Sequence, residues 1–454
     1  GINIASFGLD KNKELLICAN ANVYKLISDE EVGMGGDLNQ DGSINIQDII
    51  LSINISVIGL GYAGLPVAVA FGKQGRVIGF DISESRIKEL RGGNDGTGEI
   101  QPSELRGSSL HMISDTPGLS DCNVFIIAVP TPVDANNKPD LTAVLSSCRF
   151  VGGAMSEGAV VVIESTVYPG VTEGICGPEL ENASGLVCGK DFHLGYSPER
   201  INPGDPDHAV DKLRKVIAGQ TPQVTALLSY IYGAMTSGGV YVAKTIQTAE
   251  AAKVIENAQR DINIAFINEV SMIFSHMSIQ THDVLAAAAT KWNFLDFTPG
   301  LVGGHCIGVD PFYLAHLARE LGHDPEVILA GRRINDGMAQ FMARQINAKV
   351  RKGKLAGGGA RILVLGLVFK ENVRDLRNSK AVETIADLRD QRVSVGPAGA
   401  AHIRTGRTSS PASAGRGSCN GTSPTPSGSD RCMCACGAHG HDCGGGPRGV
   451  GVAP

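Results

Sequence analysis

The chain has 454 residues, of which 43% are hydrophobic and 19% are charged, and its formal net charge is −6 at pH 7. This length allows about two or three domains, and the composition is that of an average globular protein. Lysine and arginine are scattered rather than clustered, which argues against nucleic acid or an anionic membrane as a partner. The longest apolar runs, such as Val124–Val129, are too short to cross a bilayer.

A loop rich in acidic and amide side chains stands out in residues 1–52. Oxygen-bearing side chains recur at the spacing of an EF-hand-type calcium loop, with glycine at its sixth position: Asp37, Asn39, Asp41, Ser43 and Asp48. The last of these replaces the usual glutamate. The segment resembles one repeat of a dockerin and is foreign to the rest of the chain, so we expect calcium binding there. A polar turn before a helix is the alternative.

Strands and helices alternate from about residue 53 to about residue 390. Short β-branched runs at 53–58, 76–80, 124–129 and 160–163 are separated by helical stretches, which predicts an α/β fold with a parallel, doubly wound sheet. A long region without helix breakers, 245–276, predicts a central helix. A second strand–turn–helix pattern begins at Arg361.

A glycine-rich turn follows the first predicted strand and opens a predicted helix at 65–72, and its residues are Gly59, Leu60, Gly61, Tyr62, Ala63 and Gly64. Three glycines there permit a tight turn, close approach of a pyrophosphate, and close packing of helix on strand. Asp81 ends the next strand, where a carboxylate accepts the ribose hydroxyls of NAD and disfavours NADP. Arg86 is a candidate contact of the adenine or a phosphate. A helix N-cap is the alternative role for Asp81.

Two further predicted strands end in turn sequences, Val129–Pro132 and Glu164–Gly170. Ligands of open parallel sheets bind beyond the carboxyl ends of the strands. We therefore expect Thr131 and Thr166 near the nicotinamide half of the cofactor. Ordinary turn chemistry is the alternative, because proline, threonine and glycine are common strand terminators.

Lys253 and Asn257 lie four residues apart in the long predicted helix, so they share one helix face. A lysine and an amide that project together can stabilise an alkoxide or a thiohemiacetal oxygen. A solvated helix face is the alternative, but the small alanines around Lys253 favour a packed one.

Cys306 stands in a glycine-lined turn, Gly303–Asp310, just before a helix predicted to open at Pro311 with Asp310 as its cap. The nearby helix N-terminus stabilises a thiolate, so the pattern predicts a nucleophile with a lowered pKa. A small buried cysteine is the alternative.

After about residue 390 the hydrophobic pattern stops, and glycine, alanine, serine, proline and arginine dominate residues 391–454. Such a composition buries too little apolar surface to offset the entropy of ordering, so we expect disorder. The abrupt change suggests a shifted reading frame or a faulty junction, which sequencing of the coding DNA through codon 390 would test.

The chain from residue 54 to about 390 closely resembles the UDP-glucose/GDP-mannose dehydrogenase family. The stretches that carry the resemblance are Val57–Pro66, Glu164–Gly170, Gly195–Gly204, Ala251–Asn263, Lys291–Phe294, Gly300–Tyr313 and Lys370–Lys380. Two of them, Gly195–Gly204 and Lys291–Phe294, are most like the branch that oxidises UDP-N-acetylhexosamines at C6.

The resemblance implies a four-electron oxidation with two NAD per turnover, through a thiohemiacetal and a thioester on Cys306. It implies that Lys253 and Asn257 stabilise oxyanions. The other implied catalytic residues are Asp310 and Glu199, which aid hydrolysis, and Thr166, which positions water. The implied substrate contacts are Arg260, Gly303 and Lys370, and Arg377 is an implied cofactor contact.

The resemblance also implies a domain order. We expect a foreign segment at 1–52, an NAD-binding Rossmann domain at 53–243, a central helical catalytic domain at 244–355, and the truncated start of a UDP-binding, second Rossmann-like domain at 356–390. The central helix is where such enzymes dimerise, so a homodimer is expected, with a UDP-sugar substrate. The cysteines of the first three quarters of the chain are dispersed, as in reduced intracellular proteins, so we expect a cytoplasmic enzyme.

Three other functions remain open from the sequence, and an inactive fragment is a further alternative, because weak substrate binding is expected where the UDP-binding domain is truncated. UDP-glucose is the first alternative substrate. A two-electron hydroxyacid dehydrogenase of the 6-phosphogluconate type has a similar domain order, but it has no need of Cys306. A calcium-dependent docking protein would explain the loop at 37–48, but it would leave the rest of the chain without a function.

Overall fold

The computed structural model describes residues 53–115, 118–202, 204–352, 362–370, 373 and 375–390, and the backbone of three short strands nearer the N-terminus. Those strands are β1 (Ile4–Leu9), β2 (Leu15–Ala19) and β3 (Asn22–Lys25), which form an antiparallel sheet in the order β1-β2-β3. The predicted calcium loop at 37–48 and the predicted disordered tail at 391–454 lie outside the described residues.

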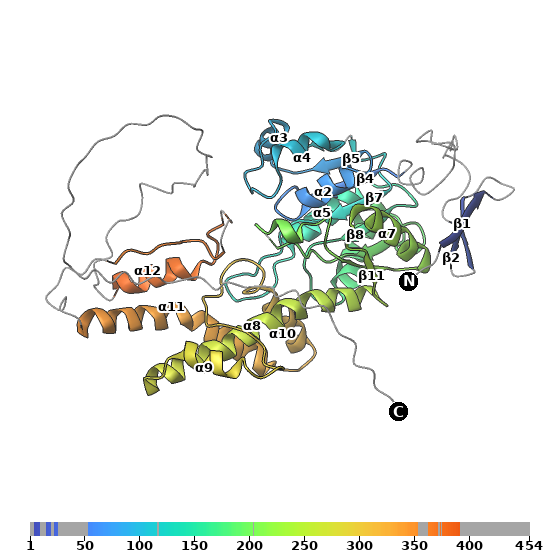
Figure 1. Cartoon of the computed structure of the whole chain (residues 1–454). Helices are drawn as coiled ribbons and strands as arrows, with labels where there is room; N and C mark the ends of the chain where they lie inside the picture. The colour runs from blue at the N-terminus through green and yellow to red at the C-terminus, as the bar shows by residue number, and fades with distance from the viewer. Residues whose placement is uncertain are drawn as a thin grey trace, which may run out of the picture. The chain divides into compact units, whose positions relative to one another are not determined.

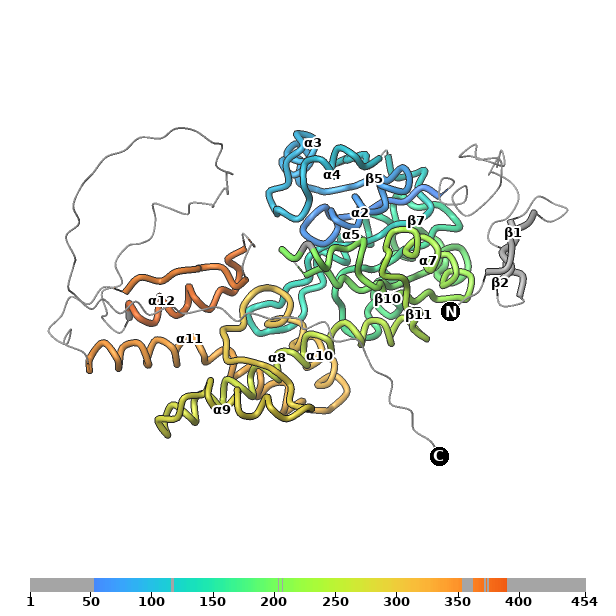
Figure 2. Tube along the Cα trace, viewed as in Figure 1, coloured from blue at the N-terminus to red at the C-terminus, as the bar shows by residue number. Residues whose placement is uncertain are grey.

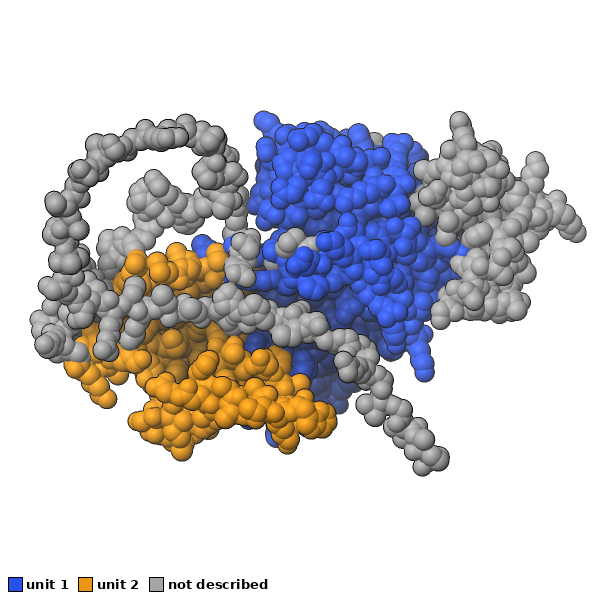
Figure 3. All heavy atoms as spheres, viewed as in Figure 1, with its two compact units in different colours: residues 1–266, 303–333, 370–378 blue, residues 267–302, 334–369, 379–454 orange. Residues whose placement is uncertain are grey.

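The chain divides into two compact units, coloured separately in Figure 3. Unit 1 comprises residues 1–266, 303–333 and 370–378, and unit 2 comprises 267–302, 334–369 and 379–454. The path of the chain through both units can be followed in Figure 2.

An eight-stranded sheet is the centre of unit 1 (Figure 1). Its order is β11-β10-β9-β8-β7-β4-β5-β6, and every neighbouring pair is parallel except β9 with β10. The strands are β4 (Ile55–Ile58), β5 (Val77–Phe80), β6 (Leu110–Ile113), β7 (Val124–Ile127), β8 (Val160–Ile163), β9 (His193–Tyr196), β10 (Lys215–Gly219) and β11 (Val240–Val242). The order reverses between β4 and β7, which is the arrangement of a Rossmann sheet and the point where such sheets bind dinucleotides.

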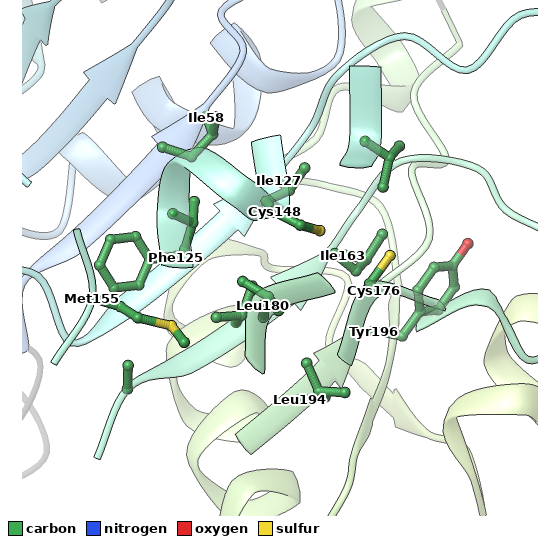
Figure 4. Packing of buried hydrophobic residues seen from close by; sticks show 14 of the residues in the cluster. Ile58, Phe125, Ile127, Cys148, Met155, Ile163, Cys176, Leu180, Leu194 and Tyr196 are labelled. Atoms are coloured by element: carbon green, nitrogen blue, oxygen red, sulfur yellow. The ribbon is translucent and has the colours of Figure 1, made fainter. Parts of the chain in front are cut away.

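Helices cover both faces of this sheet. They are α2 (Gly64–Gly72), α3 (Glu84–Arg91), α4 (Pro102–Gly107), α5 (Thr142–Gly152), α6 (Gly177–Ser184) and α7 (Pro222–Met235), with a π-helical turn at Thr172–Cys176 and a 3-10 turn at Pro206–His208. The central strands β4, β5, β7 and β8 are buried along their whole length, as their uninterrupted apolar sequences require. Figure 4 shows the packing on one face, where Phe125, Ile127 and Ile163 meet Cys148, Cys176 and Leu180. The predicted Rossmann fold is confirmed.

The remaining helices are α8 (Ile246–Met277), α9 (Thr281–Ala288), α10 (Asp310–Glu320), α11 (Glu326–Lys352) and α12 (Lys380–Asp390). The central helix predicted at 245–276 is therefore present as α8. Residues up to Phe266 of α8 belong to unit 1 and the rest to unit 2. Within unit 2, the buried Asn268 amide donates to the Gly300 carbonyl at 2.9 Å and to the Asn335 side chain at 2.8 Å.

One expected element differs from the structure. The strand predicted from Arg361 has no regular secondary structure over its described residues 362–367, although the helix after it forms as α12. A strand needs a ladder partner as well as a β-branched sequence, so the pattern alone does not make one. Among the described helices, none combines the length and apolar character that a bilayer span requires.

Candidate active site

The glycine-rich turn lies between β4 and α2, at the point where the strand order reverses. Gly59 has φ of +93°, and a β-carbon there would lie 2.7 Å from the Ala128 carbonyl oxygen. A β-carbon on Gly64 would overlap the Gly59 carbonyl, so helix and turn pack too closely for any side chain. A β-carbon on Gly61 would meet nothing within 4 Å, which leaves its backbone open to a ligand. These features fit the pyrophosphate of NAD.

Asp81 follows β5, and its carboxylate accepts the Leu60 N–H and the Ser83 N–H, both at 2.9 Å. The helix cap is Ser83, not Asp81, so the alternative N-cap role is excluded. Asp81 instead joins the glycine-rich turn to the end of β5, beside the position of the adenosine ribose in such folds.

Arg86 braces the same turn from α3. Its Nε donates to the Leu60 carbonyl at 3.0 Å, and its guanidinium also pairs with Glu89 at 3.1 Å and with the buried Asp95 at 2.7 Å. In this structure the side chain therefore fixes the turn, and three protein groups hold the cation that the sequence assigned to adenine or phosphate.

The two turns predicted to line the nicotinamide site are tied together. The Ser165 hydroxyl accepts the Val129 N–H at 2.9 Å and donates to the Val129 carbonyl at 2.7 Å, so the turn that carries Thr166 is fixed to the turn that carries Thr131. The Tyr313 hydroxyl of α10 donates to the Thr131 carbonyl at 2.9 Å. The helix that follows Cys306 is thus joined to the edge of the sheet.

Lys253 and Asn257 project from one face of α8, as predicted, and that face is packed rather than solvated. Lys253 is only 5% exposed, and its ammonium donates to Glu199 at 3.3 Å. The Asn257 amide donates to the Asp310 carboxylate at 2.6 Å. Four of the predicted catalytic side chains therefore meet at one place, although they come from three separate parts of the chain.

Asp310 is the first residue of α10 and Val309 is its N-cap, so the predicted capping role of Asp310 is wrong. Its carboxylate is used instead for the contact with Asn257, which lies across the site. Burial raises the pKa of Asp310 to about 6, although Lys253 and the hydrogen bond from Asn257 oppose that shift. Burial alone would lower the pKa of Lys253, but the nearby carboxylates of Glu199 and Asp310 outweigh it and hold the ammonium charged.

Cys306 lies one turn before α10, where its carbonyl accepts the Asp310 N–H at 2.9 Å. Its thiol is hydrogen-bonded to the phenol of Tyr62, which comes from the glycine-rich turn. Burial and the charge of Asp310 raise the pKa of Cys306 to about 12, against a smaller lowering by Lys253. The predicted lowering of this pKa by the helix N-terminus is therefore wrong, because desolvation and a nearby carboxylate outweigh a helix end.

The residues predicted to contact the substrate, together with Arg377, differ in their burial and in their partners. Lys370 donates to the Asn202 side chain, and Arg377 forms a two-point ion pair with Asp375 at 2.6 to 3.0 Å. Gly303 opens the turn that carries Cys306 and is partly buried. Arg260, by contrast, is exposed on α8.

Two buried groups near the site were not predicted from the sequence. Lys215, which opens β10, pairs with Glu164 and donates to the Pro198 carbonyl at 3.3 Å, and the Tyr232 hydroxyl donates to Glu164 at 2.9 Å. Glu250, on α8, accepts the Gly170 N–H at 2.6 Å and the Thr172 N–H at 2.9 Å. A lysine at the head of an apolar strand, and an acid one turn before Lys253, are the signals that could have identified them.

No group of three or more histidine, cysteine or acidic side chains in the described part of the chain is arranged to hold a metal ion. The combination that is present, a dinucleotide-binding turn and a buried thiol beside a lysine, an amide and a carboxylate, defines an NAD-dependent dehydrogenase.

Comparison with known proteins specifies the family. Residues 53–236 match the NAD binding domain of the UDP-glucose/GDP-mannose dehydrogenase family, and residues 247–337 match its central domain. The chain belongs to this family.

Several relatives are similar over most of their length. Protein CapL of Staphylococcus aureus is 54% identical over 342 residues, which are 75% of this chain and 81% of CapL. The UDP-N-acetyl-D-glucosamine 6-dehydrogenase of Pseudomonas aeruginosa is 50% identical over 344 residues, 76% of this chain and 82% of that protein. The structure of the UDP-D-ManNAc dehydrogenase from Pyrococcus horikoshii superposes with a TM-score of 0.68 at 33% identity, over 74% of this chain and 81% of that one.

Proposed function

We propose that the protein oxidises the C6 hydroxymethyl group of a UDP-N-acetylhexosamine to a carboxylate, with two NAD per turnover, and so supplies a uronic acid for a surface polysaccharide. The observation that carries the proposal is the grouping of Cys306 with Lys253, Asn257 and Asp310 in the unit that holds the dinucleotide-binding sheet. The names of the relatives from P. aeruginosa and P. horikoshii support an N-acetylhexosamine rather than UDP-glucose.

NAD, when bound, accepts the hydride that leaves C6 in each of the two oxidations. The protein has to remove a proton from the alcohol and hold the oxygen that remains. Asp310, with a pKa of about 6, is ionised at neutral pH and accepts that proton. Lys253 stays charged and donates a hydrogen bond to the oxygen of C6, together with the Asn257 amide.

Cys306 then retains the aldehyde. The thiol is protonated in the nucleotide-free protein, so its attack on the carbonyl carbon must release a proton. We assign this proton to Asp310 as well, after Asp310 has released the proton of the alcohol to solvent. A carbon–sulfur bond forms, and the carbonyl oxygen becomes the oxyanion of a thiohemiacetal beside Lys253 and Asn257. Loss of the second hydride gives a thioester. Water, positioned by Thr166 and Glu199, hydrolyses the thioester to the carboxylate and restores the thiol.

The remaining sequence assignments are part of this proposal. Arg260, Gly303 and Lys370 contact the nucleotide sugar, whereas Asp81, Thr131 and Arg377 contact NAD, and the domain boundaries are those that the family resemblance implies. The calcium loop at 37–48 is a separate proposal, which a calcium titration of the chain with and without Asp41→Ala would test.

We also propose a homodimer through α8 and a cytoplasmic location. Large apolar side chains are exposed along α8 at a spacing that places them on one helix face: Ile255, Phe266, Ile273 and Met277. Sedimentation of the wild type against Phe266→Glu tests the dimer. The cysteines from residue 53 onward in the described ranges are free thiols, which supports a reducing compartment: Cys122, Cys148, Cys176, Cys188 and Cys306.

The experiment for the activity is measurement of NADH formed with UDP-N-acetylglucosamine, its manno and galacto epimers, and UDP-glucose. We expect two NADH per sugar consumed with an N-acetylhexosamine. Cys306→Ser should stop the reaction or trap an intermediate. One NADH per sugar, formed equally well by Cys306→Ser, would instead indicate a two-electron dehydrogenase and would overturn the proposal.

A further inference from the structure

His305 stands immediately before the nucleophile and lies between two segments from distant parts of the chain. Its ring meets the ring of Tyr62 edge to face, with centroids 4.3 Å apart. Its Nδ1 lies 3.3 Å from the carboxylate of Asp375, and both side chains are less than one-fifth exposed. Tyr62 belongs to the glycine-rich turn, and Asp375 belongs to the last segment of unit 1.

Asp375 in turn holds Arg377. The guanidinium donates from Nε at 2.9 Å and from Nη2 at 2.6 Å, and the backbone N–H of Arg377 donates to the same carboxylate at 2.9 Å. A second contact fixes the segment, because the Asn378 amide donates to the Gly304 carbonyl at 3.1 Å. The segment 375–378 therefore contacts the turn of Cys306 at two points. One is the hydrogen bond from Asn378 to Gly304, and the other is the contact between Asp375 and His305.

The surroundings keep His305 neutral, so it is not a second cation. Burial lowers the pKa of His305, and the positive charge of Arg377 lowers it further, against the opposing effect of Asp375. The hydrogen bonds from Arg377 hold the pKa of Asp375 below its usual range in spite of burial. A neutral imidazole therefore faces an ionised carboxylate that is paired with a guanidinium, so the three side chains carry no net charge. What Arg377 offers an incoming anion is the guanidinium N–H groups that Asp375 does not accept.

We propose that His305 is a positioning residue for the cofactor: through Asp375 it holds the guanidinium of Arg377 beside the glycine-rich turn, ready for the anionic part of the dinucleotide. This rests on the proposed function only in that Arg377 contacts NAD. A guanidinium that is fixed before binding loses little side-chain freedom when the ligand arrives, so preorganisation strengthens binding without adding a contact.

The test measures binding of NADH by calorimetry, without any sugar nucleotide. His305→Phe keeps a ring against Tyr62 but removes the polar ring nitrogen that lies beside Asp375, and we expect it to weaken NADH binding roughly 5- to 30-fold. His305→Asn places an amide N–H where Nδ1 lies and removes the ring, so it should recover most of the affinity. Asp375→Asn, which weakens the hold on Arg377, should lose affinity as His305→Phe does.

A double-mutant cycle separates positioning from general damage. Because His305 acts through Asp375, the double variant should bind NADH no more weakly than the worse single variant. The matched control is Asp324→Asn, which removes an exposed carboxylate that pairs with Arg319 at 3.2 Å; its NADH affinity should equal that of the wild type.

Three results would overturn the inference: NADH affinity within twofold of wild type in both single variants, additive losses in the double variant, or no recovery in His305→Asn. If His305→Phe fails to fold, as judged by its melting temperature, the comparison of Asp375→Asn with Asp324→Asn decides. None of these outcomes depends on which sugar is oxidised. A failure of the proposed substrate would therefore leave the NADH-binding result intact, and a failure of the His305 proposal would leave the proposed substrate intact.

Discussion

The thiol of Cys306 should be protonated in the nucleotide-free protein, and this can be measured directly. A surface cysteine has a pKa of about 8.5, so about a quarter of it is thiolate at pH 8. A pKa of about 12 leaves only about one part in ten thousand as thiolate at that pH. A more basic thiolate is intrinsically more nucleophilic, and this makes each thiolate react roughly 30 to 50 times faster, which partly offsets the smaller thiolate fraction. The net expectation is alkylation about 50-fold slower than for the same cysteine in unfolded protein.

The assay is labelling with iodoacetamide, followed by mass spectrometry of the Cys306 peptide, with the chain labelled in urea as the reference. The rate should rise about tenfold per pH unit from pH 7 to pH 10 without a plateau, because the thiolate fraction rises by that factor below the pKa. The charges around the thiol give two further tests. Asp310→Asn removes a negative charge and should accelerate labelling, whereas Lys253→Met removes a positive charge and should slow it.

A plateau near pH 8 would refute this reasoning, because it would place the thiol pKa in its ordinary range despite burial. Slower labelling in Asp310→Asn would also refute it, because removal of a negative charge should lower the pKa of the thiol. Cys306→Ser, which has no thiol at this position, is the blank that excludes assignment of label from neighbouring peptides.

The site and the core beneath it support three further predictions. The pKa of Asp310 near 6 makes its carboxylate a base above that pH, so kcat/KM should fall about tenfold per pH unit below about 6, as a pH–rate profile would show. Lys215→Met leaves Glu164 buried without its cation and should cost about 3 to 5 kcal/mol in urea unfolding, whereas a loss under 1 kcal/mol would contradict the assigned pair. Gly61→Ala should keep the melting temperature but weaken NADH binding, whereas Gly64→Ala should lower both; equal melting temperatures would show that Gly64 is not sterically required.

Local patterns predicted the α/β class of unit 1 and located four of the eight strands of its sheet, β4, β5, β7 and β8, but not β6, β9, β10 and β11. The turn Gly59–Gly64, the strand before it and the helix after it are fixed by neighbours in sequence, so the glycine spacing was sufficient to locate them. The same holds for α8, whose spacing placed Lys253 and Asn257 on one face. The strand predicted from Arg361 shows the limit of local patterns, since a strand depends on a partner that no local pattern supplies.

The protonation of Cys306 and the contacts between distant residues could not be predicted from local patterns. The helix end near Cys306 is visible in the sequence, but the burial of the thiol and the approach of Asp310 result from tertiary packing, and these decide the pKa. The ion pair of Arg86 with Asp95 was not visible in the sequence, because Asp95 lies in the loop after α3, where no helix spacing connects the two. His305 and Asp375 are 70 residues apart, so only the folded chain brings them together.

The charges of the site explain why the thiol should stay protonated until it reacts. Lys253 pairs with Glu199, and Asp310 lies close enough to raise the pKa of the lysine, so one buried cation already faces two carboxylates. Ionisation of Cys306 would add another negative charge to a desolvated site, which is strongly unfavourable. Transfer of the thiol proton to Asp310 avoids this, because one negative charge disappears as the other forms. The new charge then moves to the oxygen of the substrate, beside the Lys253 ammonium.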